Sequence, residues 1–427
     1  MSVDVVVVGL GYVGLPLAQA ACSAGLSVVG FDVKDSLVAG LNAGKSHVDD
    51  LSDADIATML SQGFSATTNS SVLATADAIV ICVPTPLSDE GGPDLGAVLG
   101  ATRSIASQLK PGQLVILEST TYPGTTDEDV RPLLEANGLV AGKDFSLAFS
   151  PERIDPGNPV YGMKNTPKVV GGFTPECTER AANFYARFVD TVVRAKGTRE
   201  AELAKLIENT YRHVNIALMN ELAQFAHLLE VDLWDAIKAA SSKPFGFQAF
   251  YPGPGVGGHC IPIDPNYLSY RVKTQTGQPF RFIELAQEVN AGMPEYVKHR
   301  IQDSLNDAKL ALNGAKVLLI GVTYKPNIAD ERESPVRPLA QALLAGGADV
   351  SYHDPFVPEW NVDSEHGHHD GDRVLTSVSD VYEAAAAADI TVLLQPHKSY
   401  ELAQLASASK KLFDTRGLLQ GANVERL

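Results

Sequence analysis

The stretch from Tyr251 to Pro265, YPGPGVGGHCIPIDP, places one of the chain's four cysteines in a backbone rich in glycine and proline. Such a run indicates a backbone shaped for something that approaches it closely, although a surface turn with an incidental thiol has the same composition. A cysteine thiolate is a nucleophile, and nearby cations stabilise it. Cys260 is therefore a candidate nucleophile. Whether it is a reactive thiol or an incidental cysteine in a surface turn has to be decided from the rest of the chain.

A glycine fingerprint near the start of the chain predicts a dinucleotide site. GLGYVG follows a strand expected from Val5 to Val8 and precedes a helix expected through about Ser23. In G-x-G-x-x-G the first glycine allows the turn, the second lets a pyrophosphate approach, and the third lets helix pack on strand. The helix N-terminus then offers free N–H groups to the phosphates. The candidate cofactor contacts in this loop are Gly9, Gly11, Tyr12, Val13 and Gly14.

The second expected strand, LSVVGFDV, ends at Asp32. A carboxylate at this spacing bonds the ribose hydroxyls of NAD and repels the 2′-phosphate of NADP. We therefore expect NAD as the cofactor, with Lys34 nearby as the residue that weakens this preference. Glycine spacing alone could reflect helix–strand packing, but strand, helix and acid together favour a dinucleotide site.

Further strands at ADAIVICVPTP, QLVILEST and FSLAFSP alternate with helical stretches, which predicts a parallel, doubly wound sheet. Ligands of such sheets bind beyond the carboxyl ends of the strands. Thr85, Thr120 and Glu152 each lie just past such an end, so they are candidate site residues.

A long helix is expected from Arg199 to Glu230, where apolar residues recur at helical spacing. A helix of this length suits a spine between two domains and a dimer surface, so we expect a homodimer through it. Lys205 and Asn209 are four residues apart and share a face away from the apolar stripe. Taken alone, that face is better explained as solvated.

The last third of the chain begins again with the strand AKVLLIGVTY, a helix and the strand ADVSYHDP, and later ADITVLLQP echoes ADAIVICVPTP. Of the glycines of the G-x-G-x-x-G fingerprint, only Gly321 is present in this half. We therefore expect it to hold its ligand differently from the first half. The predicted fold class is α/β, with two Rossmann-type doubly wound parallel-sheet domains joined by a long central helix and a helical dimerisation region.

Composition and charge exclude several classes of partner. The 427 residues are 45% hydrophobic and 20% charged, as in a soluble globular protein of two or three domains. A net charge of −17 argues against nucleic acid, because phosphate binding needs a basic face. No run approaches the roughly 18 apolar residues of a membrane span, and the apolar start lacks the basic leading region of a signal peptide. We therefore expect a cytoplasmic protein with no membrane partner.

Neither a disulfide framework nor a metal site is expected. The four cysteines are widely spaced with no C-x-x-C pair, which fits a reducing compartment. Cys22 and Cys82 are expected to be small buried apolar residues. His366, His368 and His369 lie in DSEHGHHDGD without partner ligands at a recognisable spacing, so we interpret this stretch as a polar loop.

A dinucleotide site and a constrained cysteine narrow the reaction classes. A cysteine beside a nicotinamide can attack an aldehyde, and the thiohemiacetal can surrender a hydride to give a thioester that water cleaves. Such an enzyme oxidises beyond the aldehyde, and Lys205 could stabilise its thiolate.

The sequence resembles the nucleotide-sugar 6-dehydrogenase family over essentially the whole chain. Seven blocks occur in the family's order: GLGYVGLPLA, CVPTP, ESTTYPGTT, SPERIDPGN, AKLIENTYRHVNIALMNELA, PGPGVGGHCIPIDP and YKPNIADERESP. The resemblance implies an NAD-dependent four-electron oxidation of a UDP-sugar at C6 to the carboxylate. It also implies an NAD-binding domain over 1–195, a central helical domain with the cysteine loop and dimer interface over 196–300, and a UDP-sugar-binding domain over 301–427.

Roles follow from the resemblance, residue by residue. It makes Cys260 the nucleophile, and Lys205 and Asn209 the pair that stabilises the developing oxyanion. Asp264 and Glu152 resemble the carboxylates that manage protons and the hydrolytic water, and Thr120 helps to position that water; which carboxylate is the base in each step stays open. The implied cofactor contacts further along the chain are Thr85, Thr120 and Arg332, the last as a cofactor or subunit contact. The implied substrate contacts are Glu152, Arg153, Lys205, Asn209, Tyr251, Gly257, Gly258, Lys325 and Arg416.

The resemblance also bears on which UDP-sugar the chain prefers. UDP-glucose enzymes commonly have lysine before the aspartate of the cysteine loop, where this chain has Ile263, and KPFGFQAFYPGPG resembles the UDP-N-acetylhexosamine branch. An N-acetyl group needs a roomier site with different polarity, which the aromatic segment Phe245 to Tyr251 could supply. We therefore expect UDP-N-acetylglucosamine, with UDP-N-acetylmannosamine or UDP-glucose as alternatives. A two-electron hydroxy-acid dehydrogenase and an idle NAD sensor remain as further alternatives.

Overall fold

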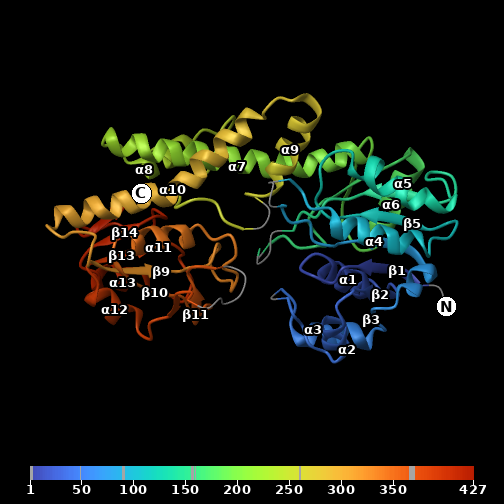
Figure 1. Cartoon of the computed structure of the whole chain (residues 1–427), viewed down its shortest axis with the longest axis horizontal. Coiled ribbons are helices and arrows are strands. Elements are labelled where there is room, and N and C mark those ends of the chain that lie inside the picture. Colours follow the sequence, from blue (N-terminus) through green and yellow to red (C-terminus); the bar gives the residue numbers. More distant parts are fainter. Residues whose placement is uncertain are drawn as a thin grey trace. The chain divides into compact units, whose positions relative to one another are not determined.

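The computed structural model describes residues 3–48, 50–88, 92–154, 158, 160–258, 261–364 and 371–427. The chain divides into two compact units: Met1–Glu208 with Asn266–Gln278 form unit 1, and Asn209–Pro265 with Pro279–Leu427 form unit 2. The division falls inside the longest helix, α7 (Thr198–Leu228), which was expected from Arg199 to Glu230. Figure 1 shows this helix in green.

Unit 1 is built on a sheet of eight strands in the order β3-β2-β1-β4-β5-β6-β7-β8. Neighbouring strands are parallel except β6 and β7, which are antiparallel. This pair departs from the parallel arrangement expected for the first domain. The strands are β1 (Val3–Val8), β2 (Val28–Phe31), β3 (Ser65–Thr67), β4 (Ala76–Ile81), β5 (Leu114–Leu117), β6 (Ser146–Phe149), β7 (Lys168–Gly172) and β8 (Val192–Arg194).

Helices cover both faces of this sheet, because its central strands are apolar on both sides. Along β1, Val5 and Val7 belong to one hydrophobic cluster, whereas Val6 and Val8 belong to another. The helices of unit 1 are α1 (Gly14–Ser23), α2 (Asp35–Asn42), α3 (Asp53–Ser61), α4 (Gly96–Ala106), α5 (Arg131–Leu134) and α6 (Pro175–Tyr185), with short turns η1 (Ser70–Thr75), η2 (Thr126–Val130) and η3 (Glu135–Asn137). Helix α9 (Asp264–Thr276) lies in this unit except for its first two residues.

Unit 2 carries a second, smaller parallel sheet in the order β10-β9-β13-β14-β15. Its strands are β9 (Lys316–Ile320), β10 (Asp349–His353), β13 (Ile390–Leu393), β14 (Leu412–Asp414) and β15 (Val424–Arg426), and β11 (Glu359–Asn361) pairs with β12 (Val374–Thr376) as an antiparallel ribbon. The helices are α8 (Leu233–Ser241), α10 (Arg281–Asp307), α11 (Val336–Ala345), α12 (Val381–Ala387) and α13 (Leu402–Ala408). The prediction of two Rossmann-type sheets joined by a long helix is therefore confirmed.

Within the part of the chain that the structure describes, no helix is both long enough and apolar enough to cross a bilayer.

Candidate active site

The loop between β1 and α1 is shaped by its glycines. A Cβ at Gly9, whose φ is +88°, would lie 2.8 Å from the carbonyl oxygen of Cys82, and one at Gly14 would lie 1.9 Å from the carbonyl oxygen of Gly9. A Cβ at Gly11 would meet nothing within 4 Å. The first and third glycines are thus required by packing, whereas the space at the second is open, as the approach of a pyrophosphate requires. Tyr12 is 44% exposed in the same loop, and Val13 is the N-cap residue of α1.

Asp32 lies directly after β2 and is half-buried. Its Oδ2 accepts a hydrogen bond from the backbone N–H of Leu10 at 3.0 Å, and its Oδ1 accepts one from the backbone N–H of Lys34 at 3.0 Å. The ring of His47 lies 2.8 Å from the carbonyl oxygen of Leu10. Asp32 and His47 therefore both brace the glycine loop, a support role that the ribose assignment of Asp32 did not include.

Hydrogen bonds connect the segments that follow β4 and β5 at the carboxyl edge of the sheet. The hydroxyl of Thr85 donates to the carbonyl oxygen of Thr120 at 2.8 Å, and that of Ser119 donates to Val83 at 2.7 Å. The hydroxyl of Tyr267, on α9, donates to the carbonyl oxygen of Thr85. The structure thus brings Thr85 and Thr120 together at the carboxyl edge where the sequence predicted them.

A carboxylate on α7 anchors the loop that follows Thr120. Glu202 is fully buried and accepts hydrogen bonds from the backbone N–H of Gly124 at 2.6 Å and of Thr126 at 2.9 Å, and from the Thr126 hydroxyl at 2.7 Å. Burial raises the pKa of Glu202 to about 7, although these hydrogen bonds oppose the shift. Glu202 was not predicted as a site residue. The signal for it in the sequence is an acidic residue within the first turns of an apolar helix.

Glu152 and Lys205 lie in unit 1, and their charges interact. The Oε1 of Glu152 accepts hydrogen bonds from the backbone N–H groups of Arg153 at 2.7 Å and Ile154 at 2.5 Å. Burial raises the pKa of Glu152 above its ordinary value, and the N–H of Ile154 and the ammonium of Lys205 oppose that shift. Arg153 is turned toward Glu208, with 2.7 Å between its Nη2 and a carboxylate oxygen.

Asn209 and Asp264 meet in unit 2. The amide nitrogen of Asn209 lies 2.5 Å from Oδ2 of Asp264, the first residue of α9. Asp264 is only 3% exposed. Cys260, the candidate nucleophile, and its neighbour His259 lie outside the described residues, and the structure describes the cysteine loop on both sides of them.

The glycines of the cysteine loop pack against the segment that contains Lys325. A Cβ at Gly257 would lie 2.8 Å from Cβ of Tyr324, and one at Gly258, whose φ is +93°, would lie 3.0 Å from the Tyr324 ring. A Cβ at Gly255 would lie 2.8 Å from Pro335. These close contacts within unit 2 are by themselves a reason for glycine at the three positions, beside the expected approach of a sugar.

A buried polar network that was not predicted from the sequence holds the start of the cysteine loop. Asn220, on α7, accepts a hydrogen bond from the backbone N–H of Gly253 at 2.9 Å and donates one to Asn290, on α10, at 2.9 Å. The amide nitrogen of Asn290 lies 3.4 Å from Nδ1 of His213. Burial lowers the pKa of His213 to about 4, so its ring is neutral at pH 7. The seven-residue spacing of His213 and Asn220 on one helix face was the available signal.

The remaining substrate candidates also lie in unit 2. Arg416 donates from Nε to the carbonyl oxygen of Leu394 at 2.5 Å, and a Cβ at Gly253 would lie 3.3 Å from its guanidinium. Burial lowers the pKa of Arg416 to about 10, so it remains cationic at pH 7. Arg416 thus lies beside the cysteine loop.

Three further predicted residues of unit 2 have local partners. The guanidinium of Arg332 binds Asp330 through two hydrogen bonds of 2.9 and 2.8 Å. The carbonyl oxygen of Lys325 accepts a hydrogen bond from Thr323 at 2.9 Å. Tyr251 is 55% exposed and stacks on Trp234 with 5.9 Å between ring centroids.

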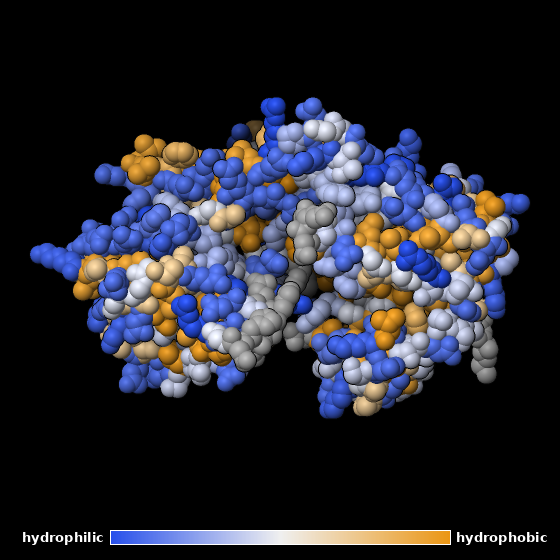
Figure 2. Space-filling view, viewed as in Figure 1, coloured by the Kyte–Doolittle hydropathy of each residue, from blue (hydrophilic) through white to orange (hydrophobic). Residues whose placement is uncertain are grey.

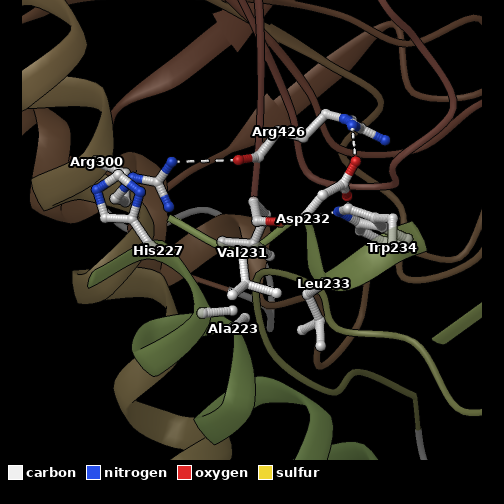
Figure 3. A pocket seen from close by; sticks show the side chains of 10 residues that line it. Ala223, His227, Val231, Asp232, Leu233, Trp234, Arg300 and Arg426 are labelled. Atoms are coloured by element: carbon white, nitrogen blue, oxygen red, sulfur yellow. Dashed lines mark hydrogen bonds and ion pairs between the residues drawn. The ribbon is translucent and has the colours of Figure 1, made fainter. Parts of the chain in front are cut away.

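A small cavity of about 70 Å³ in unit 2 is lined by other residues, including Trp234, Arg300 and Arg426. In Figure 3, Arg300 points toward the backbone of Arg426, whose side chain points toward Asp232. None of the predicted site residues lines this cavity. Within the part of the chain that the structure describes, no three histidine, cysteine or acidic side chains gather as a metal site would require. The histidines of DSEHGHHDGD lie outside that part.

The predicted residues therefore fall into two sets, one in each unit. Those of unit 1 are Gly9, Gly11, Tyr12, Val13, Gly14, Asp32, Thr85, Thr120, Glu152, Arg153 and Lys205. Those described in unit 2 are Asn209, Tyr251, Gly257, Gly258, Asp264, Lys325, Arg332 and Arg416. Lys205 and Asn209 stand one turn apart on α7, on either side of the division.

Three models of one protein family match this chain. Residues 3–189 match the NAD-binding domain of the UDP-glucose/GDP-mannose dehydrogenase family, residues 199–292 its central domain, and residues 318–421 its UDP-binding domain. A UDP-N-acetyl-D-glucosamine 6-dehydrogenase of Pseudomonas aeruginosa is 35% identical, over 98% of this chain and 97% of its own. A UDP-N-acetyl-D-mannosamine dehydrogenase of Salmonella typhi is 34% identical, over 96% and 98%.

Solved structures give the same result over almost all of the chain. A UDP-D-ManNAc dehydrogenase from Pyrococcus horikoshii superposes with a TM-score of 0.86 at 31% identity, over 99% of this chain and 98% of the other. A UDP-glucose dehydrogenase from Pyrobaculum islandicum superposes with a TM-score of 0.85 at 27% identity, over 100% and 97%. The glycine loop, the acid after β2 and these matches lead to one conclusion: the chain belongs to the UDP-glucose/GDP-mannose dehydrogenase family, with NAD as its cofactor.

Proposed function

We propose that the chain oxidises the C6 hydroxymethyl group of a UDP-sugar to the carboxylate, with UDP-N-acetylglucosamine as its preferred substrate and two NAD reduced per sugar. The observation that supports this most directly is the contact between Asn209 and Asp264, 55 positions apart. It joins the amide expected to stabilise an oxyanion to a carboxylate expected to handle protons, next to the cysteine loop.

Each residue has one task in this reaction. NAD, which the glycine loop and Asp32 would hold, would supply the hydride acceptor for both oxidations. The sulfur of Cys260 adds to the C6 aldehyde, loss of hydride leaves a thioester, and water cleaves the thioester to release the acid and restore the thiol. Lys205 and Asn209 stabilise the developing oxyanion, while Asp264 and Glu152 exchange protons with substrate and water, and Thr120 orients that water.

The substrate contacts are assigned on chemistry. Arg416 and Lys325 are cations for the diphosphate, and Arg416 is supported by its place beside Gly253 of the cysteine loop. In this proposal the sugar of the substrate is contacted by Arg153, Tyr251, Gly257 and Gly258. Arg332 contacts the cofactor or a second subunit. The regions 1–195, 196–300 and 301–427 then serve NAD binding, catalysis with dimerisation, and UDP-sugar binding.

The choice of sugar rests on Ile263 and on the aromatic segment before the cysteine loop. In that segment Phe245 is 70% exposed and Phe247 38% exposed, so both rings are available to an acetamido methyl group or to a second subunit. UDP-N-acetylmannosamine is the second candidate, because a relative named for it is 34% identical to this chain and a relative named for the glucosamine sugar is 35% identical.

The test is NAD reduction with UDP-N-acetylglucosamine, its manno and galacto isomers, and UDP-glucose. The expected result is two NADH per sugar and the highest kcat/KM with UDP-N-acetylglucosamine. One NADH per sugar would contradict the four-electron reaction. A higher kcat/KM with UDP-glucose than with every N-acetylated sugar would contradict the substrate but not the reaction type.

Cys260→Ser tests the covalent step, because a hydroxyl is a far weaker nucleophile than a thiolate. It should abolish acid formation while leaving NAD and UDP-sugar binding, and full turnover would contradict the mechanism. Lys205→Ala and Asn209→Ala test the shared oxyanion. Their combined loss should be smaller than the product of the single losses, because groups that act on one oxyanion are not additive.

We further propose that the chain forms a homodimer through α7. Leu218, Leu222, Phe225 and Leu229 follow one helical stripe and are 40–72% exposed. In Figure 2 hydrophobic residues gather at the upper left, near the place where Figure 1 labels α8, the helix that follows α7 in the chain. Phe225→Asp with Leu229→Asp should halve the mass measured by sedimentation, whereas Leu310→Asp, at another exposed leucine, should not. An unchanged mass in the first variant would contradict this interface.

A further inference from the structure

Among the charged side chains that are buried in unit 1 are two carboxylates and two ammonium groups, those of Glu118, Lys168, Glu152 and Lys205, which we call the buried quartet. Glu118 is fully buried, the Lys168 side chain is 4% exposed, that of Glu152 13%, and Lys205 8%. They come from four elements: the end of β5, the start of β7, the segment after β6, and α7. Charged groups are rarely this buried unless they compensate one another.

The contacts within the buried quartet give Lys168 a central place. Its ammonium forms an ion pair with Glu118 and lies 3.7 Å from Oε2 of Glu152. Because the backbone N–H groups of Arg153 and Ile154 hold Oε1 of Glu152, Oε2 is the oxygen turned toward Lys168. The carboxylate of Glu152 is thus fixed at one oxygen and faces a cation with the other.

The other titratable groups around Glu152 and its partners contribute little charge of their own. Tyr185, on α6, donates its hydroxyl to Glu118 at 3.0 Å, and the Cys82 thiol, after β4, lies 3.9 Å from the same carboxylate. Burial raises the pKa of Cys82 to about 12 and that of Tyr185 well above its ordinary value, so both stay neutral. Arg153 is paired with Glu208.

With all four members ionised, the two carboxylates and two ammonium groups of the buried quartet sum to zero charge. Burial lowers the pKa of Lys168 to about 7. The ion pair with Glu118 favours the charged form of Lys168, as contact with an opposite charge does. With one carboxylate removed, a net positive charge would surround Glu152; with Lys168 removed, the net charge would be negative. In a buried site such a change shifts protonation strongly.

We propose that Lys168, held by Glu118, is a positioning residue that aims Oε2 of Glu152 and keeps this carboxylate ionised, ready to take a proton. The proposal rests on the proposed function, because it assumes that Glu152 accepts the proton of the hydrolytic water. That O–H bond breaks with its electron pair left on the attacking oxygen, and the proton passes to Oε2 of Glu152. Nothing in this role requires Lys168 to touch the substrate.

The two members of the ion pair give opposite predictions. Lys168→Met should move the acidic limb of the pH profile of kcat/KM upward by about one to three pH units, the range for loss of a neighbouring opposite charge. Glu118→Gln should move it downward, and Lys168→Arg should leave it near the wild-type position. The double variant Lys168→Met/Glu118→Gln restores zero charge and should return the limb toward wild type. The matched control is Lys143→Met, which removes an exposed lysine of unit 1 and should shift nothing.

Equal shifts of both single variants in one direction would overturn the proposal, because a purely structural ion pair gives that result. Absence of any shift would overturn it as well. If Lys168→Met fails to fold, the double variant and Glu118→Gln still carry the comparison, because neither leaves an additional uncompensated carboxylate.

A second measurement separates this proposal from the proposed function. Infrared titration of protein labelled with ¹³C-glutamate, with Glu152→Gln as the reference for band assignment, reports protonation of Glu152 without turnover. The Glu152 band should titrate at higher pH in Lys168→Met and at lower pH in Glu118→Gln, even if no UDP-sugar is oxidised. Identical titration in all three proteins would overturn the role of the buried quartet and leave the dehydrogenase proposal standing.

Discussion

Asp354 occupies in unit 2 the position that Asp32 occupies in unit 1. Each follows the strand next to the first strand of its sheet, and each accepts a backbone hydrogen bond from the residue after a glycine of positive φ. Leu10 donates to Asp32 at 3.0 Å, and Val322 donates to Asp354 at 2.8 Å. Gly321 has φ +80°, close to the +88° of its counterpart in unit 1.

The two carboxylates differ in what else they bind. Asp354 is 2% exposed, and its Oδ2 lies 3.0 Å from Nε2 of His397. Because Nδ1 of His397 accepts the N–H of Asn327 at 2.9 Å, the ring proton is on Nε2 and donates to Asp354. Asp32 in unit 1 is placed to bind a ribose, whereas its counterpart Asp354 in unit 2 is already bound by His397. This difference fits the expectation that the second half of the chain holds its ligand differently from the first.

Asp354→Asn should therefore destabilise the protein by about 1–3 kcal/mol at pH 7, because an amide cannot accept all the hydrogen bonds that the buried carboxylate accepts from His397 and from backbone N–H groups. Burial alone would raise the pKa of Asp354, but hydrogen bonds from His397 and backbone N–H groups hold it below its ordinary 3.8. A lowered carboxyl pKa stabilises the folded state above the unfolded pKa, and this contribution is lost as pH falls through the folded value.

Urea unfolding at pH 7 and below pH 3.8 checks this prediction. The difference between wild type and Asp354→Asn should be large at pH 7 and should shrink in acid. Asp349→Asn, at an exposed carboxylate on the same strand, is the control and should change stability by less than about 0.5 kcal/mol. A difference independent of pH would contradict the assigned charge state.

Glu202→Gln should flatten the pH dependence of stability. The pKa of Glu202 is raised to about 7 from an ordinary 4.5, so the folded state keeps a proton that the unfolded state loses between these values. Wild-type stability should fall by on the order of 3 kcal/mol as pH rises through this window. The variant cannot titrate and should lose that slope, whereas Glu200→Gln, exposed on the same helix, should retain it. Equal slopes in all three proteins would refute the prediction.

Asn220→Ala should displace the cysteine loop without disturbing the NAD site. It leaves the buried N–H of Gly253 without its acceptor, which costs about 1–3 kcal/mol. We expect a loss of kcat with an unchanged dissociation constant for NAD, because the glycine loop belongs to the other unit. Asn215→Ala, whose side chain bonds the carbonyl oxygen of Tyr211 in its own helix, is the matched control. Unchanged kcat in Asn220→Ala would show that the loop does not need this anchor.

Local sequence pattern predicted much of the fold. The start of α1 follows from the glycine fingerprint, and α7 (Thr198–Leu228) follows from a helical apolar stripe, because both patterns record backbone geometry directly. The antiparallel placement of β7 was missed, since a short buried strand has the same composition in either direction.

The candidate site divides in the same way. Motif residues such as Asp264 can be predicted because their neighbours in the chain identify them. Glu202, Asn220 and Lys168 were not predicted, because their contacts are with residues far away in the sequence. The separation is 76 residues for Glu202 and Thr126, and 33 for Asn220 and Gly253. A polar residue on a helix or strand looks solvated until the fold shows what covers it.

Asp32→Ala should weaken NAD binding and narrow the preference for NAD over NADP. The variant loses the ribose hydrogen bond and the repulsion of the 2′-phosphate, so NAD affinity should fall about tenfold or more while NADP affinity falls less. Because Oδ2 of Asp32 also accepts the N–H of Leu10, part of the loss will come from loosening of the glycine loop, which affects both cofactors equally. The ratio of the two dissociation constants, measured by fluorescence titration, isolates the ribose contribution. Asp35→Ala, at the exposed first residue of α2, is the control and should leave that ratio unchanged. Equal losses for NAD and NADP in Asp32→Ala would assign Asp32 to loop support alone.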